Sequence, residues 1–348
     1  MKVEEICKWL CIIALVSGNC YAQKNIIAEK FTLSVDGRIE YDNVPAGTVE
    51  NDIRSSSFSS QGLILYSDIK LTNNLSIFYR QEFAGYLARE GQMNTHINML
   101  LLKYRLNRWK FTLGRQPLIN GTYEGYYLPG DVYAYSELSC GFPVWKTGTC
   151  ISRMFGKQEF GIQVLNGDLT PKEAKQQSTP LMFNVYWCGN IGNGLILSRL
   201  NFAGYASDHF SRFSSKIGLH WTLSHILLDT DFGVDHGLPG FAPDKVKVIA
   251  APIQCIWRYG LIRPGFKYLP NLIENNTESK FRFVDPGKTS YKQQLLLFLD
   301  IYPWKNKNFH LFTIGGCTEY GVYQNHTFTA SHRLYDVRVG VKFGLDLL

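Results

Sequence analysis

Short alternating segments recur from residue 30 to the C-terminus and leave hardly any room for an amphipathic helix. The last segment, YDVRVGVKFGLDLL, shows the pattern. Every second residue from Tyr335 to Leu347 is apolar, and charged residues or glycines lie between them. Because successive side chains of a strand point to opposite faces, such a segment has one apolar and one polar face. The sequence therefore predicts an all-β protein whose apolar faces meet either a protein core or lipid.

Sixteen such segments are expected, and the connections between them are alternately long and short. Turn-forming residues make the short connections, as at Asn107-Arg108, Gly156-Lys157 and Ser224-His225. An up-and-down outer-membrane barrel has this asymmetry, with short periplasmic turns and long external loops. The expected strands cover residues 30–41, 62–71, 75–87, 99–106, 109–115, 147–155, 158–166, 180–188, 195–205, 212–223, 226–235, 245–257, 261–269, 290–302, 309–323 and 334–347.

The two faces of the expected strand pairs differ in charge. A two-residue turn at Ser224-His225 places His220 opposite Asp229 and Lys216 diagonal to Asp231. A sealed protein core cannot hold so many charges, whereas a water-filled lumen can. We therefore predict a transmembrane up-and-down antiparallel β-barrel of about 16 strands, with its apolar faces toward lipid. The alternative is a soluble periplasmic sandwich or propeller.

The composition excludes several other classes of protein. The net charge of +7 is too mild to indicate a nucleic-acid partner, and no Lys/Arg cluster or RNA-binding signature is present. The aromatic content of 14% suits both strands and membrane interfaces. After the N-terminal segment, no stretch of 18 consecutive apolar residues occurs, so a membrane form of this chain must be a barrel.

Residues 1–22 are predicted to be a signal peptide, and residues 23–348 a single barrel domain in the outer membrane of a Gram-negative cell. The apolar run from Trp9 to Val16 is too short to span a bilayer, and Cys20-Tyr21-Ala22 offers a small-residue cleavage site. The alternatives are a buried helix at the start of a soluble domain and a lipoprotein anchor at Cys20.

Five cysteines follow the predicted signal peptide, at positions 140, 150, 188, 255 and 317. None of them forms a CxxC pair, so we expect no zinc site and no cofactor. Cys140 and Cys150 either form a local disulfide or remain two free, small apolar side chains.

Two short motifs and the last strand resemble a known family. FTLGRQPL covers residues 111–118, YRQEF covers residues 79–83 on an earlier strand, and the last strand has an aromatic residue near its end. Together with the barrel pattern they resemble the phosphate-selective porin O/P group and related Bacteroidetes-type porins. The resemblance implies a channel of sixteen strands, often trimeric, for small solutes and commonly for anions. Five residues follow Phe343 here, whereas outer-membrane barrels usually end in an aromatic residue.

The longest internal connection, residues 116–146, falls in the third external position. In porins this loop often folds inward and narrows the pore, so the resemblance makes it a constriction candidate. Tyrosines can line a passage without closing it, and acidic residues disfavour anions. The alternative is an ordinary exposed loop. The candidate constriction residues are Tyr123, Glu124, Tyr126, Tyr127 and Asp131.

Seven cationic residues are candidates for lining the pore and binding anions. They have inward parity, which means that they occupy the alternate strand positions whose side chains are expected to face the lumen. A guanidinium offers a forked donor to phosphate or carboxylate, and an ammonium offers a point charge. Acidic residues share the same parity, so a lumen of mixed charge is favoured over a dedicated phosphate ladder. The candidates are Arg80, Lys103, Arg105, Lys110, Lys216, Arg338 and Lys342.

Asp229, Asp231 and Asp235 alternate along one expected strand. Rigid spacing on one face rarely wraps a calcium ion, so we expect these carboxylates to pair with His220 and Lys216 rather than to bind metal.

Function follows from the barrel and from the absence of a catalytic signature. The histidines are scattered, and none lies in a motif such as GxSxG or HExxH. We therefore expect a porin, surrounded by outer-membrane lipid, that passes small hydrophilic solutes or anions; a homotrimer is what the family resemblance implies. The alternatives are a structural or docking barrel of a surface complex and an outer-membrane barrel hydrolase.

Overall fold

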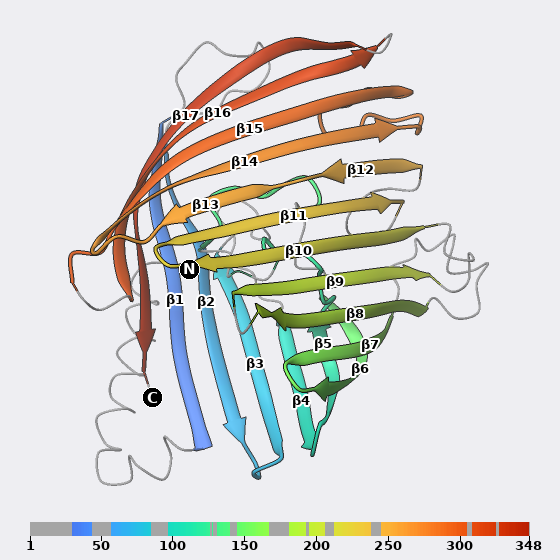
Figure 1. Ribbon diagram of the computed structural model, residues 1–348, viewed down its shortest axis with the longest axis vertical. Coiled ribbons are helices and arrows are strands. Elements are labelled where there is room, and N and C mark those ends of the chain that lie inside the picture. The colour runs from blue at the N-terminus through green and yellow to red at the C-terminus, as the bar shows by residue number, and fades with distance from the viewer. Residues whose placement is uncertain are drawn as a thin grey trace.

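In the computed structural model, antiparallel strands follow one another around a closed ring (Figure 1). The ring closes where β1 (Phe31–Asn43) pairs with β17 (Thr327–Asp346), with Val35 opposite Leu345. The predicted up-and-down barrel is therefore confirmed, and the alternative of a sandwich or propeller is wrong. The structure describes residues 30–43, 57–84, 97–125, 127, 131–139, 145–166, 181–192, 195–205, 212–237, 245–304, 308–324 and 327–347.

One wall position is shared by two short strands. β12 and β13 both pair with β11 and β14, and Ala251-Pro252 separates them because proline has no N–H for the ladder. In the described part of the chain, seventeen strands therefore fill sixteen wall positions, which agrees with the number expected from the sequence. The other strands are β2 (Ser57–Lys70), β3 (Leu75–Ala84), β4 (Met99–Leu106), β5 (Trp109–Pro117), β6 (Trp145–Phe155), β7 (Gln158–Asn166), β8 (Leu181–Ile191), β9 (Ile196–Tyr205), β10 (Phe213–Leu223), β11 (Ile226–His236), β12 (Val246–Ala250), β13 (Ile253–Trp257), β14 (Ile262–Asn275), β15 (Lys288–Ile301) and β16 (Phe309–Gln324).

The short turns have the backbone that tight hairpins require. Asn107 has a φ of 51°, Ser224 of 44° and Gly156 of 61°. These left-handed values match the turn to the right-handed twist of the strands that it joins. In a barrel of this type the short-turn end is the periplasmic end.

The last external connection differs from the prediction. Residues 324–333 were expected to form a long loop, but β16 and β17 continue until Gln324 pairs with Thr327. β17 has 20 residues, about twice what a tilted strand needs to cross a bilayer, so its first half extends beyond the lipid. Polar residues such as Glu319 and Arg333 are stable on the outer face there, and the alternation that marks a strand is lost.

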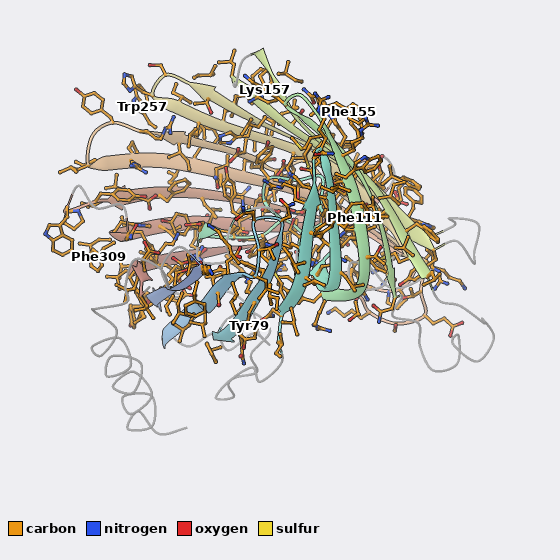
Figure 2. The ribbon with its side chains drawn as sticks, turned by 90° about the horizontal axis from the view of Figure 1, so that it is seen from below. Tyr79, Phe111, Phe155, Lys157, Trp257 and Phe309 are labelled. Carbon is orange, nitrogen blue, oxygen red and sulfur yellow. The ribbon has the colours of Figure 1, made fainter. Side chains whose placement is uncertain are left out.

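The outer face of the wall is apolar along the rest of the strands (Figure 2). On β17, Tyr335, Val337 and Val339 are 46–51% exposed. Near the short turns, the aromatic side chains of Phe155 and Trp257 are about half exposed as well. An apolar band with aromatic residues at its border is what a membrane barrel presents to lipid. Among the described residues, no helix has the length and apolar character to cross a bilayer.

Candidate functional site

Residues 118–125, 127 and 131–139, here called the inner loop, follow β5 and lie inside the ring. Their teal trace crosses behind β10–β13 in Figure 1. Hydrogen bonds join the loop to β7, β10 and β14 on one side and to β1 and β17 on the other. The third external connection therefore occupies the inward position that a constriction requires, and its constricting role stays a prediction.

A row of buried amides holds the first part of the inner loop. Gln163 Oε1 accepts the N–H of Ile119 at 2.8 Å, and Asn201 Oδ1 accepts the N–H of Gly121 at 2.8 Å. The amides also bond to one another along the wall at 2.8–3.1 Å. Because each amide carries both donors and acceptors, the row can bond to itself and to the loop backbone at the same time, although the buried Nε2 of Gln116 has no partner among the described residues. Its members are Gln116, Gln163, Asn184 and Asn201, all at most 3% exposed.

The loop backbone then touches the wall directly at Gly121. A Cβ at this position would lie 2.1 Å from the carbonyl oxygen of Lys216, so only glycine fits. Next along the chain, the Asp231 carboxylate accepts the N–H groups of Tyr123 at 2.9 Å and Glu124 at 3.1 Å. Asp231 therefore anchors the loop backbone.

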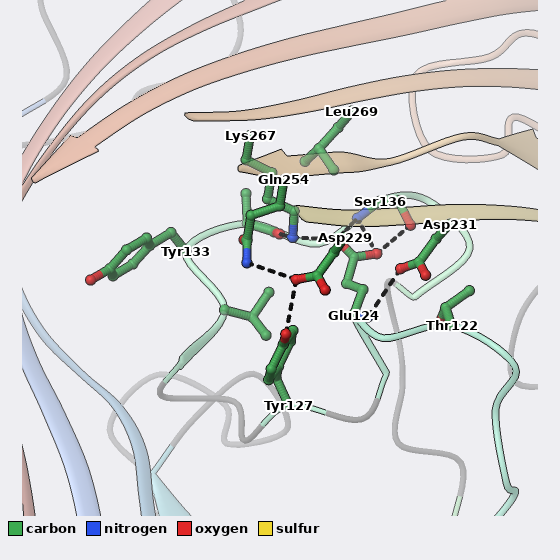
Figure 3. Close-up of polar contacts among 12 residues, drawn as sticks. Thr122, Glu124, Tyr127, Tyr133, Ser136, Asp229, Asp231, Gln254, Lys267 and Leu269 are labelled. Atoms are coloured by element: carbon green, nitrogen blue, oxygen red, sulfur yellow. Dashed lines mark hydrogen bonds and ion pairs between the residues drawn. The ribbon is translucent and has the colours of Figure 1, made fainter. Parts of the chain in front are cut away.

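Glu124 closes the inner loop on itself (Figure 3). Its carboxylate accepts the N–H of Ser136 at 2.9 and 3.0 Å and the ammonium of Lys267 at 2.6 Å. Lys267 on β14 also donates to the carbonyl oxygen of Ala134 at 2.7 Å. The side chains of the Lys267–Glu124 pair are at most 4% exposed, so this contact is shielded from water.

Arginines hold the second part of the loop from the opposite wall. Arg38 Nη1 donates to the Val132 carbonyl at 3.1 Å, and Arg338 Nη1 donates to the Tyr133 carbonyl at 2.7 Å. The Tyr133 hydroxyl bonds to Asp300 on β15. The loop therefore bridges the barrel between walls that lie far apart in sequence.

Three of the seven predicted cations contact the inner loop: Lys216, Arg338 and Lys342. Lys216 Nζ donates to the Leu138 carbonyl at 3.0 Å and lies 3.3 Å from Asp235 Oδ2. Lys342 forms an ion pair with Asp131 of the loop. These side chains face inward, as their parity predicts, and meet protein groups there.

Arg80 lies elsewhere on the inner wall. Its guanidinium carbon is 4.9 Å from the ring centroid of Trp145, and Nη2 lies 3.8 Å from Glu82 Oε2. Arg80 is only 8% exposed, so it also is largely covered by protein.

The other three predicted cations gather around a pocket near the short turns. Lys103, Arg105 and Lys110 line this pocket of about 310 Å³, together with Asp68 and Lys70. Lys110 also pairs with Glu159 at 2.5 Å, and Lys103 lies over the ring of Phe78. The lining is of mixed charge with an excess of positive groups.

Of the constriction candidates, Tyr123, Glu124, Tyr127 and Asp131 belong to the inner loop, and Tyr126 lies outside the described residues. The Tyr127 hydroxyl donates to Asp229 Oδ2 at 2.8 Å and lies 3.3 Å from His220 Nδ1. Burial, together with the charge of Asp229, raises the pKa of Tyr127, so the phenol stays protonated.

The aspartates of β11 pair with His220 and Lys216, as predicted, and Asp231 binds the inner loop. His220 lies opposite Asp229, with Nδ1 2.6 Å from Oδ1, as expected. Lys216 pairs with Asp235, and the backbone of the inner loop occupies Asp231. All three carboxylates of this strand have protein partners.

Parts of the inward face are apolar, although the sequence predicts that the inward faces are polar. Tyr133 of the inner loop packs on Phe298 and Phe312, with ring centroids 5.1 and 5.2 Å apart. Leu296 and Ile314 complete this cluster and are fully buried. The covering loop, not lipid or lumen water, is the neighbour of these inward side chains.

Three further cationic residues at inward strand positions contact the inner loop but were not among the predicted candidates. Arg38, Lys267 and Lys292 all hold the inner loop, the last through Glu137 at 2.8 Å. Each lies on an alternating segment with inward parity, the same signal that selected Arg80. Cys150 is a free, buried thiol 3.5 Å from the hydroxyl of Tyr186, and Cys140 lies outside the described residues.

Gln163→Leu is expected to lower the free energy of unfolding by about 1–3 kcal/mol, because it leaves the buried groups around this amide unsatisfied. Denaturant-induced unfolding of the folded barrel in vesicles measures the effect. Gln254→Leu is the matched control, since that amide makes one bond, to Asp229 at 3.3 Å. Equal midpoints for the two variants would contradict the anchoring role of the amide row.

No protein-family model matches this chain, and no curated protein sequence matches it either. Its structure is similar to the outer membrane channel DcaP of Acinetobacter baumannii, with 13% identity and a TM-score of 0.62 over 90% of this chain and 96% of that one. It is also similar to an anion-selective porin from Comamonas acidovorans, with 14% identity and a TM-score of 0.61 over 90% and 98% of the two chains. Salmonella typhi OmpF, in complex with daunomycin, has 10% identity and a TM-score of 0.57 over 90% and 97%. At these identities the likeness establishes a shared barrel fold alone.

Proposed function

We propose that this chain is a porin of the Gram-negative outer membrane that lets small hydrophilic solutes diffuse passively, and that it is not an enzyme. The observation that carries the proposal is the inner loop, which lies within a closed barrel and is bonded to opposite walls. A loop fixed in this way narrows a passage without filling the mouth of the barrel. Its contacts are structural in character: beside the His220–Asp229 pair, the Tyr127 hydroxyl donates its proton to Asp229 in a hydrogen bond.

The preferred solutes of this porin are small anions. Lys103, Arg105 and Lys110 supply positive charge around the pocket at the short-turn end, where Asp68 offsets only part of it. The Comamonas porin with this fold is anion-selective, and the sequence motifs resemble phosphate-selective porins. These likenesses support an anion preference, and phosphate is the first anion to test.

The double variant Lys103→Glu/Arg105→Glu is expected to lower the anion-to-cation permeability ratio about fivefold. Two charge reversals within ~8 Å of a passing ion change the energy of an anion relative to that of a cation by about 1 kcal/mol after salt screening. Reversal potentials under a salt gradient in a planar bilayer measure the ratio. Arg333→Glu, on the outer face, is the control and leaves the ratio unchanged. A reversal potential of the double variant equal to that of the native protein rejects these residues as pore lining.

Bilayer conductance also separates the porin from its alternatives. A structural or docking barrel shows no solute flux when it is folded, and a barrel hydrolase loses a lipid or peptide bond-cleaving activity when His220 is replaced. Folded protein with ohmic conductance, and with no such activity, is the result expected here. Cross-linking in native membranes tests the proposed homotrimer, and N-terminal sequencing of the mature protein tests cleavage of residues 1–22.

A further inference from the structure

The outer face near the short turns carries an arginine, Arg153, that points away from the lumen and so does not line the proposed solute path. Arg153 on β6 is exposed and lies between two aromatic rings on the lipid side. Its guanidinium carbon is 5.1 Å from the ring centroid of Trp109 and 4.8 Å from that of Phe155. Both rings are themselves exposed, by 40% and 47%. Figure 2 shows Phe155 and Lys157 close together at the rim of the ring.

The rings around Arg153 belong to a continuous aromatic band. Phe111 stacks beside Trp109 at 6.4 Å between centroids, Phe160 meets Phe155 edge-on at 5.9 Å, and Trp187 stacks on Phe160 at 6.4 Å. Aromatic bands on membrane barrels lie at the level of the lipid headgroups. Arg153 is therefore at headgroup depth on the periplasmic side.

Two further cations border Arg153. Arg108 and Lys157 lie in neighbouring short turns and are exposed. The N–H of Met154 donates to the carbonyl of Arg108 at 2.9 Å, which places the two turns side by side. Glu159, the acidic residue nearest in sequence, faces the lumen and bonds there to Lys110 and Ser152. These three cations are here called the periplasmic arginine patch, and none of them forms an ion pair with a carboxylate of the residues that the structure describes.

The geometry of Arg153 suits one kind of ligand group. Its guanidinium forms no hydrogen bond or ion pair with any residue that the structure describes, and its contacts are with the faces of the two rings. Ring contacts cover the faces of a guanidinium and leave its in-plane N–H edges available. Those edges match the paired oxygens of a phosphate diester.

We propose that the periplasmic arginine patch binds the phosphate of an anionic phospholipid in the periplasmic leaflet, with Trp109 and Phe155 against the lipid's glycerol and upper acyl chains. A zwitterionic lipid carries an ammonium beside its phosphate, which the three cations repel. The inference rests on the proposed placement in the outer membrane but not on solute passage.

Lipid titration of the folded full-length protein tests this proposal. Native mass spectrometry in detergent counts bound phosphatidylglycerol and phosphatidylethanolamine at matched concentrations. The native protein is expected to retain phosphatidylglycerol preferentially. Arg153→Gln is expected to weaken phosphatidylglycerol binding about fivefold and to leave phosphatidylethanolamine binding unchanged.

Arg333→Gln is the matched control, because Arg333 is an exposed arginine at the opposite end of the barrel, paired with Glu319 at 2.6 Å. This variant keeps the native lipid preference. If Arg153→Gln does not fold, the double variant Arg108→Gln/Lys157→Gln replaces it, with the same expected direction. Equal phosphatidylglycerol binding by native protein and a folded patch variant overturns the proposal, as does a native protein that binds both lipids equally. This test does not depend on conductance, so lipid binding can be interpreted even if the chain does not pass solutes.

Discussion

Lys216→Met is expected to lower the free energy of unfolding by about 3–5 kcal/mol. The Lys216 side chain is 1% exposed, and its ammonium lies 3.3 Å from Asp235 Oδ2 and 3.0 Å from the carbonyl of Leu138. Methionine fills a similar volume but carries no charge. The fully buried Asp235 carboxylate then loses its counter-ion, and the inner loop loses the donor to Leu138.

Urea-induced unfolding from vesicles, followed by tryptophan fluorescence, measures this loss. The double variant Lys216→Met/Asp235→Leu is the control, because neither charge remains buried and most of the stability returns. Single-channel recordings of Lys216→Met are expected to show larger current fluctuations, since the end of the inner loop is less firmly held. If Lys216→Met unfolds at the same urea concentration as the native protein, the buried pair does not stabilise the loop.

The fold could be predicted because lipid and water lie on opposite sides of one layer of strands. Alternation with period two marks each strand, and tight turns such as Ser224-His225 set the register between neighbours. The contact between His220 and Asp229 follows from that register alone. Prediction failed at residues 327–333, where β17 has left the lipid and the alternate residues Thr327, Thr329 and Arg333 are polar instead of apolar.

The contacts of the inner loop could not be predicted from the sequence in the same way. Its contacts join residues far apart in sequence, such as Asp231 with Tyr123 and Arg338 with Tyr133, and no periodicity marks them. Parity shows that Lys216 faces inward but not whether it meets water or a loop carbonyl. For the same reason, the sequence does not show that the inward side chain of Leu296 packs in a cluster with Tyr133 of the inner loop.

The apolar face of β17 provides the second large expected effect. Val339→Lys is expected to make folding into a bilayer less favourable by about 2–4 kcal/mol, the cost of a lysine near the midplane on the lipid face of a barrel. Val339 is 46% exposed and lies inside the apolar stretch of this strand, between Tyr335 and Leu345. Its wall neighbours Tyr41 and Thr313 supply no carboxylate to pair with the new ammonium.

Leu345→Lys on the same strand and the same face is the control for depth. Leu345 is 54% exposed near the periplasmic border, where a lysine reaches the headgroups and costs about 0–1 kcal/mol. Folding into vesicles across a urea series, read by tryptophan fluorescence, compares the two variants directly. A soluble core would penalise both substitutions according to burial, whereas lipid penalises them according to depth. Equal costs at positions 339 and 345 would therefore show that hydrocarbon does not surround this face.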